Sequence, residues 1–239
     1  MSPRTVVVVP CFNEARRLDA AAIGMLIDDA VDVLIVDDGS TDDTADVAEA
    51  AGLRVLRLPH NVGKGEAVRH GLRHALDGGA AIVGYLDADL STPISEYRRL
   101  IAALVDDAAV DVILGSRIAH LGARIERRAA RHYLGRLFAT SASLALGLAV
   151  YDTQCGAKVF RDTQAFRAAL QAPFTSRWAF DVELLARLLD AGLDPARLRE
   201  VPLHAWRDVA GSHLSLPGMA TAAKDVLALA LRRRRRRRR

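Results

Sequence analysis

Strand-like apolar runs alternate with helical patterns five times in the first half of the chain, which restricts the folds open to it. The runs lie at Thr5–Pro10, Val31–Val36, Leu53–Leu58, Ala81–Leu86 and Val110–Leu114, and the first is rich in β-branched residues and apolar on both faces. Such strands are typical of a parallel sheet buried between two layers of helices. We therefore predict an α/β fold with a doubly wound, mostly parallel sheet and flanking helices.

The remaining segments complete the expected order of elements. Helices are predicted at Ala15–Asp29, at Asp42–Ala51, from the His60–Gly65 loop to about Leu76, and at Ser95–Val105. After Arg117 the rhythm changes, and the sequence predicts a basic segment at Ala119–Arg136, an apolar helix at Leu137–Val150, a turn with a short strand at Tyr151–Phe160, a helix at Ser176–Leu189, a strand at Leu198–Trp206 and an apolar helix at Met219–Leu231.

Charge is divided unevenly along the chain. Eight of the 33 basic residues form the run Arg232–Arg239, and the rest of the chain carries 25 basic against 29 acidic residues, a net charge of −4. The mildly acidic body gives no reason to expect specific nucleic-acid binding. The run itself is expected to be disordered and able to bind anionic lipid. We predict one domain at residues 1–214, an amphipathic membrane-proximal helix at 215–231 and a disordered tail at 232–239.

Cysteine and histidine usage argues against a disulfide framework and against zinc. Cys11 and Cys155 each stand alone, and the seven histidines show no paired spacing. Cys155 has no histidine placed to activate it, so packing is the simpler interpretation of its role. The chain shows neither a leader pattern nor an apolar stretch of about 18 residues, so the sequence predicts a cytoplasmic protein.

Two carboxylates, Asp87 and Asp89, follow the fourth predicted strand. Alternate residues of an extended chain point the same way, and the carboxyl ends of parallel strands border the crevice where such sheets bind ligands. Two hard oxygen donors there could hold a divalent cation that takes its other ligands from substrate phosphates. An exposed turn with two solvated acids would explain an isolated Asp-x-Asp equally well, so the other strand ends have to decide.

The other strand ends carry further candidates for binding groups. The acids of Asp37–Asp43 suit a turn that begins a helix, or hydrogen bonds from a base or ribose. Asn61–Gly65 lacks the spacing of a P-loop, and the first strand lacks the glycine turn of a dinucleotide site. Lys64 could still approach a diphosphate from a helix N-terminus. Phosphate contact and solvated surface charge are both open for three cations beside predicted strand ends or turns: Arg117, Lys158 and Arg207.

The order of these segments resembles that of a known family. The inverting family 2 glycosyltransferases with the GT-A fold are similar to this chain at Pro10–Glu14 (PCFNE), Val36–Asp42 (VDDGSTD), Asn61–Gly65 (NVGKG), Asp87–Asp89 and Gly115–Arg117. Their polyprenyl-phosphate branch, dolichyl-phosphate β-glucosyltransferases first and mannosyltransferases next, resembles it at Asp152–Gly156 (DTQCG) with Lys158 and Phe160, at Phe180–Glu183 and at Trp206–Ser212. The resemblance covers roughly residues 5–214.

The resemblance implies a role for each matching residue. The nucleotide sugar would contact Pro10, Phe12, Glu14, Val36, Asp38, Lys64, Asp87 and Ala88, with Asp38 near the base and Lys64 near the ribose and diphosphate. Asp89 would ligate Mg²⁺ or Mn²⁺ on the diphosphate and act in catalysis together with Asp181, which would orient the acceptor. The diphosphate and the lipid phosphate would contact Arg117, Arg131, Lys158, Arg207, Ser212 and His213.

Three positions depart from the family pattern. Ser91 stands where mannosyl members usually carry Gln, which weakens a GDP-mannose assignment. Phe12 replaces a common Tyr, a change expected to be harmless. His213 replaces a usual Lys or Arg, so one phosphate contact is expected to be weaker or pH-dependent.

The resemblance implies an inverting enzyme that moves a hexose, by preference glucose from UDP-glucose, onto polyprenyl or dolichyl phosphate. Two apolar helices flanked by arginines, Leu137–Val150 and Met219–Leu231, suit peripheral docking at the cytoplasmic membrane face. The acceptor needs no general base, because a phosphate monoester is a dianion near neutrality. Three alternatives stay open: a GDP-mannose-dependent polyprenyl-phosphate mannosyltransferase, a family 2 transferase with a non-lipid acceptor, and a binding module without turnover.

Overall fold

The computed structural model describes residues 3–126, 129–176, 179–209, 225, 226 and 228, with residues 129–137 described by their backbone alone. Several predictions therefore lie outside the described residues: the side chain of Arg131, Ser212 and His213, the boundary at residue 214 and the tail at 232–239. Of the helix predicted at 215–231, the structure describes three residues. Val226 is buried in the same core as α7 (Phe180–Asp190), and Asp225 accepts a hydrogen bond from the Ser176 hydroxyl.

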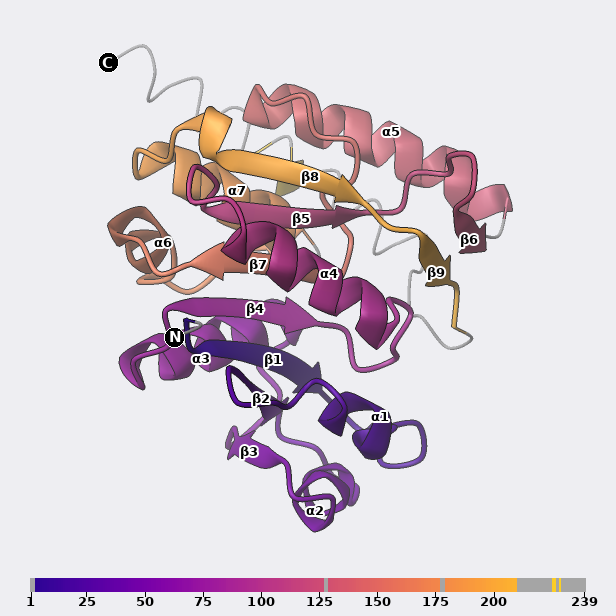
Figure 1. Ribbon diagram of the computed structural model, residues 1–239, viewed down its shortest axis with the longest axis vertical. Coiled ribbons are helices and arrows are strands. Elements are labelled where there is room, and N and C mark those ends of the chain that lie inside the picture. Colours follow the sequence, from indigo (N-terminus) through magenta and orange to yellow (C-terminus); the bar gives the residue numbers. More distant parts are fainter. Residues whose placement is uncertain (1–2, 127–128, 177–178, 210–224, 227, 229–239) are drawn as a thin grey trace.

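A seven-stranded sheet forms the centre of the molecule, with strand order β3-β2-β1-β4-β7-β5-β8 (Figure 1). Its strands are β1 (Thr5–Cys11), β2 (Val31–Asp37), β3 (Arg54–Arg57), β4 (Ile82–Leu86), β5 (Val112–Ser116), β7 (Ala157–Arg161) and β8 (Leu198–Pro202). Strand β7 runs antiparallel to both of its neighbours, and the other pairs are parallel. The prediction of a mostly parallel sheet is confirmed, and its five strands correspond to β1–β5.

Helices cover both faces of the sheet, because successive residues of its apolar strands point to opposite sides. Val7 and Val9 belong to the core under α1 (Ala20–Gly24), α2 (Thr44–Ala50) and α4 (Ile94–Val105), and α4 lies in front of the sheet in Figure 1. Val6 and Val8 belong to the core under α3 (Lys64–Asp77), α5 (Ala129–Leu146), α6 (Gln164–Ala169) and α7. None of the helices in the part of the chain that the structure describes is both long and apolar enough to cross a membrane.

Two helices differ from the prediction in their bounds. The helix predicted at Ala15–Asp29 is only the five residues of α1, since Asp19 caps its first turn and Asp28 accepts the N–H groups of Ala30 and Val31 in a turn before β2. The predicted helix Leu137–Val150 begins earlier and ends at Leu146, where Gly147 takes a φ of +68°.

The predicted strand Leu198–Trp206 is divided between two sheets. Its second part, β9 (Ala205–Arg207), pairs with β6 (Arg124–Glu126) after a break at Leu203, whose N–H donates to the Ser116 carbonyl. The sequence did not predict β6, α6 or the 3₁₀ turn at Pro195–Arg197. The consequence for the site is that β9 leaves the main sheet and carries Arg207 toward the end of β4.

Candidate functional site

The residue after β4, Asp87, is held on three sides. Its N–H donates to the Gly156 carbonyl at 3.0 Å, and its carboxylate forms an ion pair with the Lys64 ammonium at 2.6 Å. A Cβ on Gly156 would overlap the Asp87 carboxylate, so that carboxylate occupies the space which only glycine leaves open. Asp87 therefore has one defined position at the carboxyl end of β4.

Asp89 lies one residue further along a tight turn and is partly exposed. Its carboxylate accepts the Ser91 N–H at 2.9 Å, and Leu90 between them takes the left-handed φ of +50°, which is uncommon for a residue with a branched side chain. The Arg207 N–H donates to the Ser91 carbonyl at 3.1 Å. This contact brings β9, and with it Arg207, to the Asp-x-Asp turn.

Lys64 is the first residue of α3, and the loop before it is held by Asp38. The buried Asp38 carboxylate accepts the N–H groups of Val62 at 2.8 Å and Gly63 at 2.9 Å. Burial acts to lower the pKa of the Lys64 ammonium, but the carboxylates of Asp87, Asp181 and Asp89 outweigh it and raise that pKa above its ordinary value. Lys64 is therefore a firmly protonated cation beside three acids.

Asp181 lies in the first turn of α7 and is buried. One of its oxygens accepts the Tyr85 hydroxyl and forms an ion pair with the Lys158 ammonium at 2.6 Å. Lys158 is completely buried, and it also donates to the Cys155 carbonyl at 2.6 Å. The sequence predicted a phosphate contact for Lys158, but in this structure its ammonium is directed to Asp181 inside the protein.

Arg117 follows β5, and Asp152 fixes the plane of its guanidinium. The Asp152 carboxylate accepts Arg117 Nε at 2.7 Å, a terminal nitrogen at 2.8 Å and the backbone N–H at 3.0 Å. The guanidinium lies 5.2 Å from the centre of the Trp206 ring, next to Arg207. Glu200 in turn accepts the N–H groups of Tyr151 and Asp152 at 2.8 Å and 2.6 Å. This role of Glu200 was not predicted from the sequence, because Glu200 stands in no motif.

The loops after β1 and β2 are tied together at the same edge of the sheet. The Asn13 N–H donates to the Ser40 hydroxyl at 3.0 Å, and the Thr41 N–H donates to the Asn13 side chain at 2.9 Å. The exposed ring of Phe12 lies in this loop pair, and Pro10 lies just before it, near the end of β1. Glu14 lies there too, but its carboxylate is paired with Arg17 at 2.6 Å.

Two predicted nucleotide contacts point into the core instead. Val36 is fully buried and its methyl group approaches Gly71 of α3. Ala88 is buried in the core on the opposite face of the sheet. The structure thus gathers Asp87, Asp89, Lys64, Arg117, Arg207 and Asp181 around one edge, while the side chains of Val36 and Ala88 lie behind it.

The donor set at this edge fits a Mg²⁺ or Mn²⁺ ion. In the described ranges no three Asp, Glu, His or Cys side chains gather into a complete metal site. The partly exposed carboxylate of Asp89 is the hard oxygen ligand that Mg²⁺ prefers, and this ion commonly takes one or two protein carboxylates and completes its shell with water and substrate phosphates.

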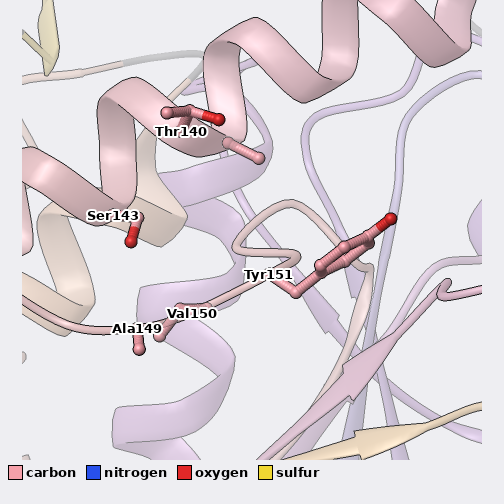
Figure 2. A pocket seen from close by; sticks show the side chains of 6 residues that line it. Thr140, Ser143, Ala149, Val150 and Tyr151 are labelled. Carbon is pink, nitrogen blue, oxygen red and sulfur yellow. The ribbon is translucent and has the colours of Figure 1, made fainter.

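A cavity of about 230 Å³ opens between α5 and the segment before β7 (Figure 2). It is lined by Ala139, Thr140, Ser143, Ala149, Val150 and Tyr151. Figure 2 shows Thr140 and Ser143 on the helix and Val150 and Tyr151 on the facing segment. Since Tyr151 precedes Asp152, the cavity lies next to the segment that holds Arg117.

Two known proteins are similar to this chain in sequence. A dolichyl-phosphate β-glucosyltransferase of Trichomonas vaginalis is 31% identical, over 95% of this chain and 71% of its own. A polyprenol monophosphomannose synthase of Mycolicibacterium smegmatis is 28% identical, over 84% of this chain and 76% of its own.

A third comparison concerns the fold. The Mycobacterium tuberculosis glucosyl-3-phosphoglycerate synthase, solved with Mn²⁺, UDP-glucose and phosphoglyceric acid, superposes with a TM-score of 0.71 at 23% identity, over 97% of this chain and 79% of that one. At this identity the likeness shows the fold alone, which is GT-A. The model of glycosyl transferase family 2 matches residues 6–166. With the strand-end acids and cations in place around one edge of a GT-A sheet, the chain belongs to glycosyl transferase family 2 and is a hexosyltransferase.

Proposed function

We propose that the chain transfers glucose from UDP-glucose to a polyprenyl or dolichyl phosphate with inversion at the sugar. The observation that carries this proposal is the gathering of Asp89, Lys64, Arg117 and Arg207 around the end of β4. Those groups suit two phosphate-bearing substrates that meet at one point. The similarity to a dolichyl-phosphate β-glucosyltransferase over 95% of the chain supports the choice of glucose and of the lipid phosphate.

On the donor side, the leaving diphosphate has to be stabilised as its bond to the sugar breaks. A Mg²⁺ or Mn²⁺ ion held by Asp89 would supply that charge stabilisation. Lys64 at the N-terminus of α3 lies where an anion is favoured by the first N–H groups of a helix. The exposed ring of Phe12 offers a stacking surface for the base.

On the acceptor side, Arg117 and Arg207 would hold the attacking phosphate. Asp152 binds Nε and one terminal nitrogen of Arg117 and so fixes the plane of the guanidinium, and the other terminal nitrogen would contact a phosphate oxygen. The acceptor is already ionised near neutrality, so no residue has to remove a proton. Asp181 would orient the acceptor from a fixed position, and Lys158 offsets its charge so that a dianion can approach.

We further propose that the enzyme is peripheral to a membrane, at its cytoplasmic face. Leu144 on α5 and Leu121 in the loop before β6 are strongly exposed, as expected for a surface that lies in a lipid interface. The cavity beside Tyr151 would receive the first part of the isoprenoid chain while its phosphate contacts Arg117. The cytoplasmic face is chosen because the sequence predicts a cytoplasmic protein.

The test is sugar transfer to polyprenyl phosphate in detergent, with UDP-glucose and GDP-mannose compared side by side in Mg²⁺ or Mn²⁺. Metal-dependent transfer from UDP-glucose that is lost in Asp89→Asn, and retained in the exposed control Asp106→Asn, is the expected result. Transfer from GDP-mannose alone would favour the mannosyltransferase alternative, which the similarity to the polyprenol monophosphomannose synthase keeps open. UDP-glucose binding without transfer to the lipid would refute the proposed acceptor.

A further inference from the structure

The two carboxylates of the Asp-x-Asp turn have different partners. The Asp87 carboxylate lies against Gly156 and is paired with the Lys64 ammonium at 2.6 Å, whereas the Asp89 carboxylate accepts a backbone N–H from Ser91. Both side chains are partly exposed, Lys64 at 47% and Asp87 at 29%, although the Asp87 oxygen that forms the pair is itself buried. Because both side chains reach the surface, an arriving ion of suitable charge can displace one partner from the other.

Lys64 stands at a position that disfavours a cation. It is the first residue of the 14-residue helix α3, where the helix dipole stabilises negative charge and the capping residue, Gly63, supplies no side chain. A lysine there needs an anion close by. In this structure that anion is Asp87, and in the proposed donor complex a diphosphate at the same helix terminus would serve equally well.

The charges that act on Lys64 add up to a simple balance, in which Arg117 is left out because Asp152 neutralises it. Asp87, Asp89 and Asp181 all act on the Lys64 ammonium, and Lys158 offsets Asp181 from inside the protein. With both lysines present, the three acids retain one net negative charge. Without Lys64 they would carry two, with Asp87 and Asp89 both available to a divalent cation.

We propose that Lys64 is a placeholder cation. In the donor-free enzyme it neutralises Asp87 and keeps the affinity of the turn for a bare divalent metal ion low. When a nucleotide diphosphate enters with its metal ion, Lys64 exchanges Asp87 for the diphosphate, so that metal and nucleotide bind together. The inference rests on the proposed function for the identity of the diphosphate ligand.

The test is Mn²⁺ binding to the nucleotide-free protein, followed by electron paramagnetic resonance of the free ion. Lys64→Met is expected to bind Mn²⁺ roughly tenfold more tightly than the wild type, since a unit charge near a divalent ion is removed. Lys64→Arg keeps the charge and should match the wild type. Adding Asp87→Asn to Lys64→Met should return the affinity to the wild-type level. Lys64→Gln serves as a second neutral variant, and thermal unfolding confirms that each protein is folded.

Unchanged Mn²⁺ affinity in folded Lys64→Met and Lys64→Gln would overturn the proposal. An equal gain in Lys64→Arg would also overturn it, because charge would then not be the cause. Adding UDP to the wild type tests the proposed function separately. If UDP fails to increase Mn²⁺ binding, the donor site is wrong, whereas the comparison of the Lys64 variants without nucleotide still decides the role of the lysine.

Discussion

The carboxylate of Asp38 accepts the N–H of Gly63 at 2.9 Å, across 25 residues of the chain. Its other oxygen accepts the N–H of Val62 at 2.8 Å. Because Gly63 directly precedes α3, this one buried side chain determines where α3 begins and where Lys64 stands. The family resemblance implies a contact of Asp38 with the base, and the structure adds a role in building the phosphate side of the site.

Replacing Asp38 with Ala should therefore destabilise the fold and weaken transfer together. The buried N–H of Gly63 would lose its acceptor, and an unsatisfied buried donor costs about 1–3 kcal/mol. The free energy of unfolding in denaturant measures the loss. The exposed Asp29→Ala is the matched control and should change this free energy by less than about 0.5 kcal/mol. Equal effects of the two substitutions would contradict the role assigned to Asp38.

The buried pair of Lys158 and Asp181 should show strong energetic coupling. Lys158→Met leaves the Asp181 carboxylate without its counter-ion, and breaking such a buried pair costs about 3–5 kcal/mol. Asp181→Asn in the same chain removes the stranded charge, so the double variant should be more stable than Lys158→Met alone. A double-mutant cycle on the free energy of unfolding measures the coupling. Simple additivity would show that the pair does not act as a unit.

The sequence predicts the central strands well because their evidence is local. Runs such as Thr5–Pro10 are apolar on both faces, and few other structures bury such a run. The acids at Asp87 and Asp89 are likewise visible as an interruption at the end of a strand. Strand ends on one edge of a parallel sheet must meet, so the prediction of a shared site follows from topology alone.

The missed features depend on partners that are distant in the sequence. The predicted strand Leu198–Trp206 runs through most of β9, but the sequence could not show that β9 separates from β8 to pair with β6, because β6 was not predicted. The sequence cannot show that Lys158 points to Asp181 and not to solvent, because side-chain direction depends on which neighbours pack around β7. Glu200 is missed for the same reason, as its partners at Tyr151 and Asp152 lie on another element.

The buried thiol of Cys155 should make the fold less stable at high pH. Burial raises the pKa of the Cys155 thiol from 9.0 to about 11, although the nearby Arg117 acts in the opposite direction. A thiol that holds its proton more tightly in the folded state contributes its full stabilisation below pH 9, and this is lost as the pH rises toward 11. The free energy of unfolding should decline over that range, and less steeply in Cys155→Ala. Equal declines would mean that other groups cause the loss.

Gly156→Ala should impair catalysis by moving one carboxylate. The new methyl group would overlap the Asp87 carboxylate, which is partly exposed and can turn toward solvent, away from Lys64. Because a misplacement of about 1 Å in a site can cost on the order of 100-fold in rate, we expect kcat/KM for sugar transfer to fall by a factor of this order. Gly24→Ala is the matched control, since its Cβ would lie 3.9 Å from the nearest side chain, an ordinary contact. That control should keep full activity and gain slightly in stability, as glycine-to-alanine changes in helices do. Full activity in Gly156→Ala would show that transfer does not require the Asp87 carboxylate at its position next to residue 156.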